Sequence, residues 1–307
     1  MFCAVRFLGV LRRQPTTSAI GGLCLIVSTA AAAAGCRNGS PLVLTQQVEA
    51  RRLASTIRVQ FNKAIEASNR AVMEVTDEAS AAAARESEQA TQAVERDLTT
   101  LERVLGELAY GDESRQLETF KTCFGGYRTL DADILPLAVE NTNIKAQRLS
   151  FGPARDAATA FRQALDAAGR SSAAKNACCV DALIQKAVAA VLDVQVTQAR
   201  HIAESDDGPM SQMEREMAAS QAAARKSLEE LKQLVPPPAQ PRVDAAIAAL
   251  DRFDAVNAEL VTLSRRNSNV RSMALSLGKK RTVTAECDAI LQGIESALAK
   301  HNFSATR

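Results

Sequence analysis

The chain has 307 residues, of which 47% are hydrophobic, 23% are charged and 4% are aromatic, and its formal net charge of +2 is too small to indicate a nucleic-acid partner. Alanine supplies much of the apolar content, and tryptophan is absent. Because alanine has the highest helix propensity whereas sheets favour β-branched and aromatic residues, the composition predicts an all-α fold.

Residues 1–36 are interpreted as an export segment. Three arginines precede an apolar run over residues 19–34, which ends in two alanines, a glycine and Cys36. This order is typical of a secretory signal. The last four residues resemble a bacterial lipobox, whose cysteine is acylated and becomes the N-terminus after cleavage. The sequence therefore predicts a lipoprotein whose partner is membrane lipid, bound through Cys36.

Three other interpretations of the segment stay open: an uncleaved membrane helix, ordinary cleavage and an incidental apolar run. The run is marginally short for a bilayer span. We expect the chain on the periplasmic side of a bacterial membrane. Residue 37 is arginine, not the aspartate that retains Gram-negative lipoproteins in the inner membrane, so outer-membrane sorting stays open as well.

Four of the seven cysteines follow the lipobox, namely Cys123, Cys178, Cys179 and Cys287. An oxidising periplasm would permit disulfides among them, and the sequence leaves their pairing open. Their spacing matches neither a metal site nor a haem attachment site, so we favour small buried apolar side chains.

Long helices are expected after residue 37. The first covers about residues 44–75, with apolar residues at steps of four. A break at Thr76 offers an N-cap for the second helix, which should end near Leu108. A third element should run from about Glu113 to a turn or kink at residues 152–153.

The same pattern occurs a second time. Residues 141–152 match residues 267–278 without a gap, with five identities, and the register extends upstream so that Phe124 falls opposite Leu250. We assign residues 37–172 to repeat one, 173–303 to repeat two and 304–307 to a tail. The predicted architecture is one or two four-helix bundles of long antiparallel helices. In repeat two we expect the third helix to run through Gly278.

The repeated N-[TS]-N-[IV]-[KR] and LS-x-G segments and the alanine-rich helices resemble the periplasmic four-helix-bundle sensor region of methyl-accepting chemotaxis receptors. The resemblance covers about residues 42–303. It implies a bundle that responds to small organic acids or amino acids. The 307 residues include no signalling domain, so a membrane receptor or kinase would have to carry the message.

The coiled-coil-like apolar seam, continued along the third element, places an asparagine of each repeat on the core face. Two interpretations stay open. The asparagines fix helix register, or they belong to a polar pocket for a small anionic ligand. The pocket would be lined by Asn141, Asn143, Lys145, Arg148, Asn267, Asn269 and Arg271.

Catalytic and metal-binding patterns are weak. His201 is interpreted as a surface residue at a helix end, and His301 as a solvated residue near the C-terminus. The spacing of His201 from Asp206 and Asp207 is not that of a metal site. We see no base placed beside a nucleophile and no phosphate-binding loop. We therefore expect no enzyme, no cofactor and no bound metal.

The expected function is a non-catalytic, sensor-like bundle that binds a small ligand or a partner receptor. The alternative is a structural or scaffolding lipoprotein that acts only through protein–protein contacts. A haem or metal bundle without a covalent attachment motif is a third hypothesis. Whether the chain forms a homodimer stays open.

Overall fold

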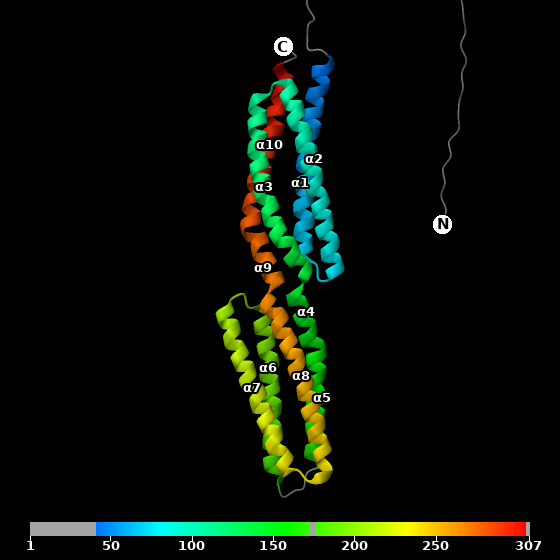
Figure 1. The fold of residues 1–307 in the computed structure, drawn as a ribbon, viewed down its shortest axis with the longest axis vertical. Coiled ribbons are helices and arrows are strands. Elements are labelled where there is room, and N and C mark those ends of the chain that lie inside the picture. Colours follow the sequence, from blue (N-terminus) through cyan, green and yellow to red (C-terminus); the bar gives the residue numbers. More distant parts are fainter. Residues whose placement is uncertain (1–40, 172–175, 305–307) are drawn as a thin grey trace, which may run out of the picture. The chain divides into compact units, whose positions relative to one another are not determined.

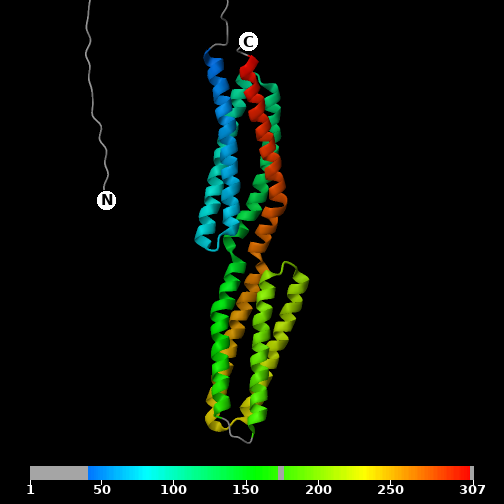
Figure 2. The same cartoon turned by 180° about the vertical axis from the view of Figure 1, so that it is seen from behind.

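The computed structural model describes residues 41–171 and 176–304, and within these ranges every regular element is a helix (Figures 1 and 2). The all-α prediction is confirmed. The export segment and Cys36 lie outside the described residues. In the part that is described, we find no helix with the length and apolar character needed to cross a bilayer.

Each repeat contains two long helices followed by an interrupted third element. The elements of repeat one are α1 (Pro41–Met73), α2 (Asp77–Leu108), α3 (Gly111–Glu140), α4 (Thr142–Leu149), the π-helix η1 (Ser150–Ala154) and α5 (Arg155–Arg170). Those of repeat two are α6 (Ala177–Ala203), α7 (Asp207–Leu234), the short 3-10 helix η3 (Pro237–Ala239), α8 (Gln240–Arg266), α9 (Ser268–Leu275), the π-helix η4 (Ser276–Lys280) and α10 (Arg281–Ser304).

The helices form two four-helix bundles, each of which contains helices from both repeats. The first bundle consists of α1, α2, α3 and α10, and the second of α5, α6, α7 and α8 (Figures 1 and 2). The first two helices of a repeat thus stay in one bundle, while its third element crosses into the other. The repeats and the bundles are therefore different divisions of the chain.

Two apolar cores hold these bundles together. In the first, Phe61 of α1 packs edge-on against Phe120 and Tyr127 of α3, with ring centroids 5.8 and 5.1 Å apart. The second contains Phe161 of α5, with leucines and alanines of the three helices around it. The stripe predicted from the repeat is confirmed, since its matched residues Phe124 and Leu250 are both buried.

Helix boundaries in repeat one follow local sequence signals. Thr76 caps α2, because its Oγ1 accepts a hydrogen bond from the backbone N–H of Ala79 at 3.2 Å. The α2 helix ends at Leu108, as predicted. Its C-cap, Ala109, has a φ of 57° and therefore lies in the left-handed region.

The third element of each repeat is interrupted by an asparagine that the sequence did not indicate as a helix end. Asn141 ends α3 with a φ of 49°, and Asn267 ends α8 with a φ of 54°. Asparagine tolerates this left-handed conformation because its short polar side chain can bond nearby groups. The expected kink at residues 152–153 coincides with η1, but repeat two has the matching π-helix η4 where we expected α-helix to continue through Gly278.

One disulfide joins the two repeats. Cys123 of α3 is bonded to Cys287 of α10, at a sequence separation of 164. Cys178 and Cys179 are free and exposed at the start of α6, so the expectation that they are buried apolar side chains is wrong.

Candidate functional site at the junction of the two bundles

The helices α4 and α9 lie side by side where the bundles meet, and a local twofold relation connects them. We call residues 140–154 and 266–280 the junction. Backbone N–H groups bond to side chains 126 positions away in both directions. The N–H of Thr142 donates to Ser268 Oγ at 3.0 Å, and the N–H of Ser268 donates to Thr142 Oγ1 at 3.0 Å. The equivalent bonds between Asn143 and Asn269 measure 3.1 and 3.2 Å.

The four asparagine side chains of the junction bond to one another and to neighbouring helices. The Nδ2 of Asn143 donates to Asn267 Oδ1 at 2.8 Å, and that of Asn269 donates to Asn141 Oδ1 at 2.9 Å. Asn143 also donates to the carbonyl of Ile202 at 2.8 Å. These bonds satisfy amides that would otherwise be buried without partners. The asparagine side chains thus join the two repeats at the junction.

The charged residues of the predicted anion pocket point elsewhere. Lys145 lies 2.8 Å from Asp77 at the start of α2, where its hydrogen bond lowers the pKa of the aspartate. The Arg148 guanidinium donates to the carbonyl of Val75 at 2.7 Å, and Arg271 is exposed. The predicted set therefore divides into a bonded asparagine cluster and separate cations, and no single pocket collects it.

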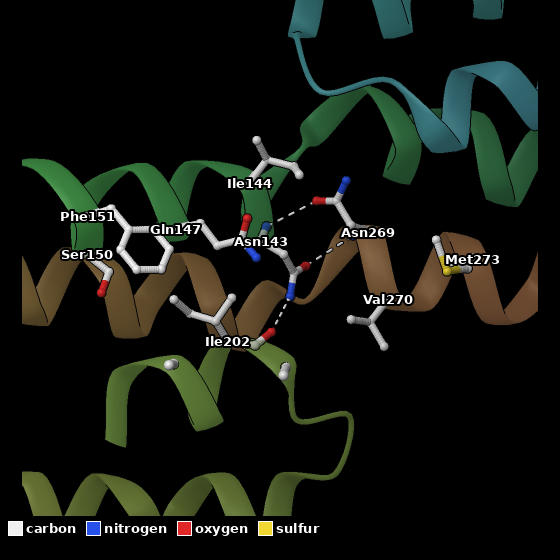
Figure 3. A pocket seen from close by; sticks show the side chains of 11 residues that line it. Asn143, Ile144, Gln147, Ser150, Phe151, Ile202, Asn269, Val270 and Met273 are labelled. Atoms are coloured by element: carbon white, nitrogen blue, oxygen red, sulfur yellow. Dashed lines mark hydrogen bonds between the residues drawn. The ribbon is translucent and has the colours of Figure 1, made fainter. Parts of the chain in front are cut away.

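A cavity of about 260 Å³ opens beside the asparagine cluster, and we call it the α6 pocket (Figure 3). Asn143 and Asn269 form its polar edge, pointing toward one another in Figure 3. The rest is mostly apolar, including Phe151 of η1 and Ile202 of α6. Its walls come from α4 and η1 of repeat one and from α6 and α9 of repeat two.

A buried ion pair crosses the first bundle close to the junction. Lys280 Nζ lies 2.8 Å from Asp131 Oδ1, and both side chains are almost fully inaccessible. The carboxylate also accepts hydrogen bonds from Ser68 at 2.5 Å and from Tyr127 at 2.9 Å. Burial lowers the pKa of Lys280, and burial together with Asp131 raises that of Tyr127. Sequence reasoning missed this layer, because Lys280 reads as part of a solvated basic run.

The second bundle has a neutral layer at the matching positions. Asn257 replaces the aspartate, and Ala154 replaces the lysine. Gln198 Nε2 donates to Asn257 Oδ1 at 2.9 Å, and Ser150 donates to Gln198 Oε1 at 2.9 Å. This buried layer is therefore charged in the first bundle and neutral in the second, although both are four-helix bundles.

The prediction that His201 lies at the surface is wrong, because its side chain is fully buried between α6, α7 and α8. Its Nδ1 lies 2.8 Å from Ser264 Oγ, and its Nε2 lies 3.1 Å from Glu214 Oε1. Arg265 completes the cluster by donating to Glu214 at 2.6 Å.

This cluster places a base beside a nucleophile, which the sequence had not indicated. The Ser264 hydroxyl, however, donates to the carbonyl of His201 at 2.9 Å and is fully buried. A serine without solvent access cannot meet a substrate, so the cluster acts to hold three helices together. His301, expected in solvent, stacks on Tyr110 with ring centroids 3.9 Å apart and lies 2.8 Å from Glu113.

No family model matches the sequence, and a search of curated proteins found no match. Among the described residues, no three His, Cys, Asp or Glu side chains are grouped to hold a metal ion. The resemblance to chemotaxis receptor sensor regions stays a prediction.

Proposed function

We propose that this chain is a lipid-anchored periplasmic module that binds a small, largely apolar ligand in the α6 pocket. It acts without catalysis, and it communicates the bound state to a membrane receptor or kinase. The observation that supports this proposal most strongly is that both repeats contribute to the pocket walls. The pocket lies where the third element of each repeat passes from one bundle into the other.

A ligand at this position would stabilise one arrangement of the junction. It would touch η1, which leads into α5 of the second bundle, and α9, which leads through η4 into α10 of the first. A ligand can shift a conformational equilibrium only through a difference in affinity between the two states. We expect contacts with both third elements to supply such a difference.

The lining indicates an uncharged ligand in this pocket. The Asn143 amide donates to Ile202 and Asn267, and the Asn269 amide donates to Asn141, so Gln147 is the one lining amide without a hydrogen bond among the described residues. Phe151, which is 66% exposed at the rim, offers an apolar surface that a ligand would cover. The anionic ligand expected from the sequence therefore fits this pocket poorly.

The Cys123–Cys287 disulfide supports export, because such bonds persist in oxidising compartments. The anchoring half of the proposal is tested by Cys36→Ser in the full chain. Unmodified chain should incorporate a fatty-acid label and sediment with membranes, whereas the variant should do neither. Equal labelling of both would refute anchoring through this cysteine.

The binding half is tested by filling the pocket from an exposed position. Ala199 lines the pocket, and Ala189 lies exposed on the same helix outside it. We expect indole or cyclohexanol to raise the melting temperature of the unmodified chain, because a ligand stabilises the folded state by RT ln(1 + [L]/Kd). Ala199→Phe should abolish the rise, and Ala189→Phe should preserve it.

Three outcomes would contradict binding in the α6 pocket: no rise with either probe, a rise that survives Ala199→Phe, or loss of the rise in both variants. The first outcome, together with co-purification of a membrane protein, would favour the scaffolding alternative.

A further inference from the structure

A second cavity, of about 420 Å³, lies between α1 and η4, and we call it the α1 pocket. It is related to the α6 pocket by the repeat. Val72, Ser276 and Leu277 line it at positions equivalent to Ile202, Ser150 and Phe151. Its volume lies within the range of roughly 300–1,000 Å³ that is typical of small-molecule sites.

Both cavities lie beside π-helices. Three residues of the α1 pocket, Ser276, Leu277 and Lys280, belong to η4. Single π-turns inside α-helices occur frequently at functional sites, because the wider turn changes which side chains face a neighbouring helix. Both repeats contain this irregular turn, as η1 and as η4.

The charge of the α1 pocket distinguishes it from its counterpart. Lys280 and Arg281 line the α1 pocket, whereas no charged side chain lines the α6 pocket. Lys280 turns its ammonium group inward to Asp131, so its aliphatic stem is what remains to line the cavity. Arg281 is exposed at the pocket, and no carboxylate in the described ranges forms an ion pair with it.

A polar amide lines the same pocket as Arg281. Asn69 of α1 lines the pocket, and its Oδ1 accepts a hydrogen bond from Ser276 at 3.1 Å. The Nδ2 group then remains as a donor. An arginine and an amide that line one cavity can hold a carboxylate, because hydrogen bonds to a charged group are stronger than those between neutral groups.

The remaining wall is apolar and open to solvent. Met73 is 67% exposed and Leu277 is 68% exposed, although both are large apolar side chains. Ile65 and Val72 lie on the same wall. An apolar surface next to an unpaired cation suits a molecule that has an alkyl chain and an anionic head.

We propose that the α1 pocket binds a medium-chain fatty carboxylate. Its chain lies along Val72, Met73 and Leu277, and its carboxylate faces Arg281 and the Asn69 amide. This proposal does not rest on the one for the α6 pocket, because the two cavities share only Met273 among the described lining residues. Failure of one proposal would leave the other in place.

The test uses the full chain in a mild maltoside detergent and a photoreactive diazirine analogue of octanoate. After irradiation, mass spectrometry maps the labelled residues, and competition with unlabelled octanoate gives an apparent Kd. We expect label on α1 near Val72 and on η4. The matching octanol analogue should label this site at least about tenfold less, because it lacks the charge.

The repeat supplies matched controls. Arg281→Gln should weaken octanoate binding about tenfold, whereas Arg155→Gln, at the equivalent position of repeat one, should leave it unchanged. Leu277→Gln should weaken binding through the alkyl chain, and Phe151→Gln should not. These four residues are exposed, so the variants should fold.

Label spread without preference for the α1 pocket, equal labelling by the acid and the alcohol, or equal effects of Arg281→Gln and Arg155→Gln would each overturn the proposal. Loss of α6-pocket binding in Ala199→Phe has no bearing on these results, so the two sites are tested separately.

Discussion

At the scale of single residues, the largest difference between the bundles is one buried ion pair. Removal of one partner leaves the other charge buried without compensation. We expect Lys280→Ala to destabilise the chain by about 3–5 kcal/mol, because Asp131 stays 5% exposed within the core. Urea denaturation followed by circular dichroism measures this loss.

The second bundle provides the control for that experiment. Ser68→Gln, Asp131→Asn and Lys280→Ala together reproduce the neutral layer of Gln198, Asn257 and Ala154. We expect the triple variant to be more stable than Lys280→Ala alone, since no charge is left unpaired. If the stability losses of the three single variants simply added up in the triple variant, Lys280 and Asp131 would not act as a pair in stabilising this layer.

Glu214 gives a residue-scale prediction for pH. Its hydrogen bond from Arg265 lowers the pKa of the carboxyl below the usual 4.5. The folded state therefore favours the carboxylate, which adds stability above the usual value and loses it as the pH falls through the lowered one. We expect Glu214→Gln to melt below the unmodified chain at pH 7 and the difference to shrink toward pH 3.

Thermal melts across this pH range check the expectation. The control is Glu66→Gln, because the Glu66 side chain is exposed and forms no hydrogen bond or ion pair with another described residue. Its difference from the unmodified chain should stay constant with pH. If the melting-temperature difference for Glu214→Gln also stayed constant with pH, the Arg265–Glu214 ion pair would not contribute to the pH dependence of stability.

At the scale of elements, the end of α2 carries a backbone cost that can be relieved. Ala109 is exposed with a φ of 57°, a conformation that glycine adopts without steric penalty. We expect Ala109→Gly to stabilise the chain by about 0.5–1 kcal/mol, measured by urea denaturation.

The same substitution inside that helix should have the opposite sign. Ala82 is exposed within α2, where glycine costs about 1 kcal/mol relative to alanine. Ala82→Gly should therefore destabilise. If both substitutions changed the stability in the same direction, the left-handed cap would not be strained.

Much of the helix plan could be predicted from the sequence, because caps and apolar spacing act locally. Thr76 and Leu108 mark real ends of α2. The interruptions at Asn141 and Asn267 could not be predicted, since the apolar seam on either side stays in register and the left-handed turn depends on contacts between repeats.

Only part of the site could be predicted, because many of its contacts join residues that are distant in the sequence. Asn143 and Asn269 do edge a pocket, but Lys145 and Arg148 bind groups at the α1–α2 connection, which no spacing along the third element reveals. The burial of His201 depends on Ser264 and Glu214, which lie on other helices. Contacts with residues on other helices therefore decide where these side chains lie.

At the scale of the whole molecule, each bundle is completed by a helix from the other repeat. The apolar stripes of α5 and α10 are alike, so sequence pattern alone does not say which bundle each one joins. The interior charge distinguishes them, because Lys280 precedes α10 and its partner Asp131 lies in the first bundle. Separation of the repeats would open both bundles at once.

The disulfide fixes this exchange covalently, and its removal should be costly. Cys123 and Cys287 have a sequence separation of 164, and for a loop of this size the chain-entropy account gives a stabilisation of about 5 kcal/mol. We expect a reducing agent or Cys123→Ser to lower the urea midpoint strongly, whereas Cys178→Ser and Cys179→Ser, at exposed free thiols, should leave it unchanged. Thiol titration of the variants identifies the bonded pair, and loss of stability in Cys178→Ser instead would contradict this pairing.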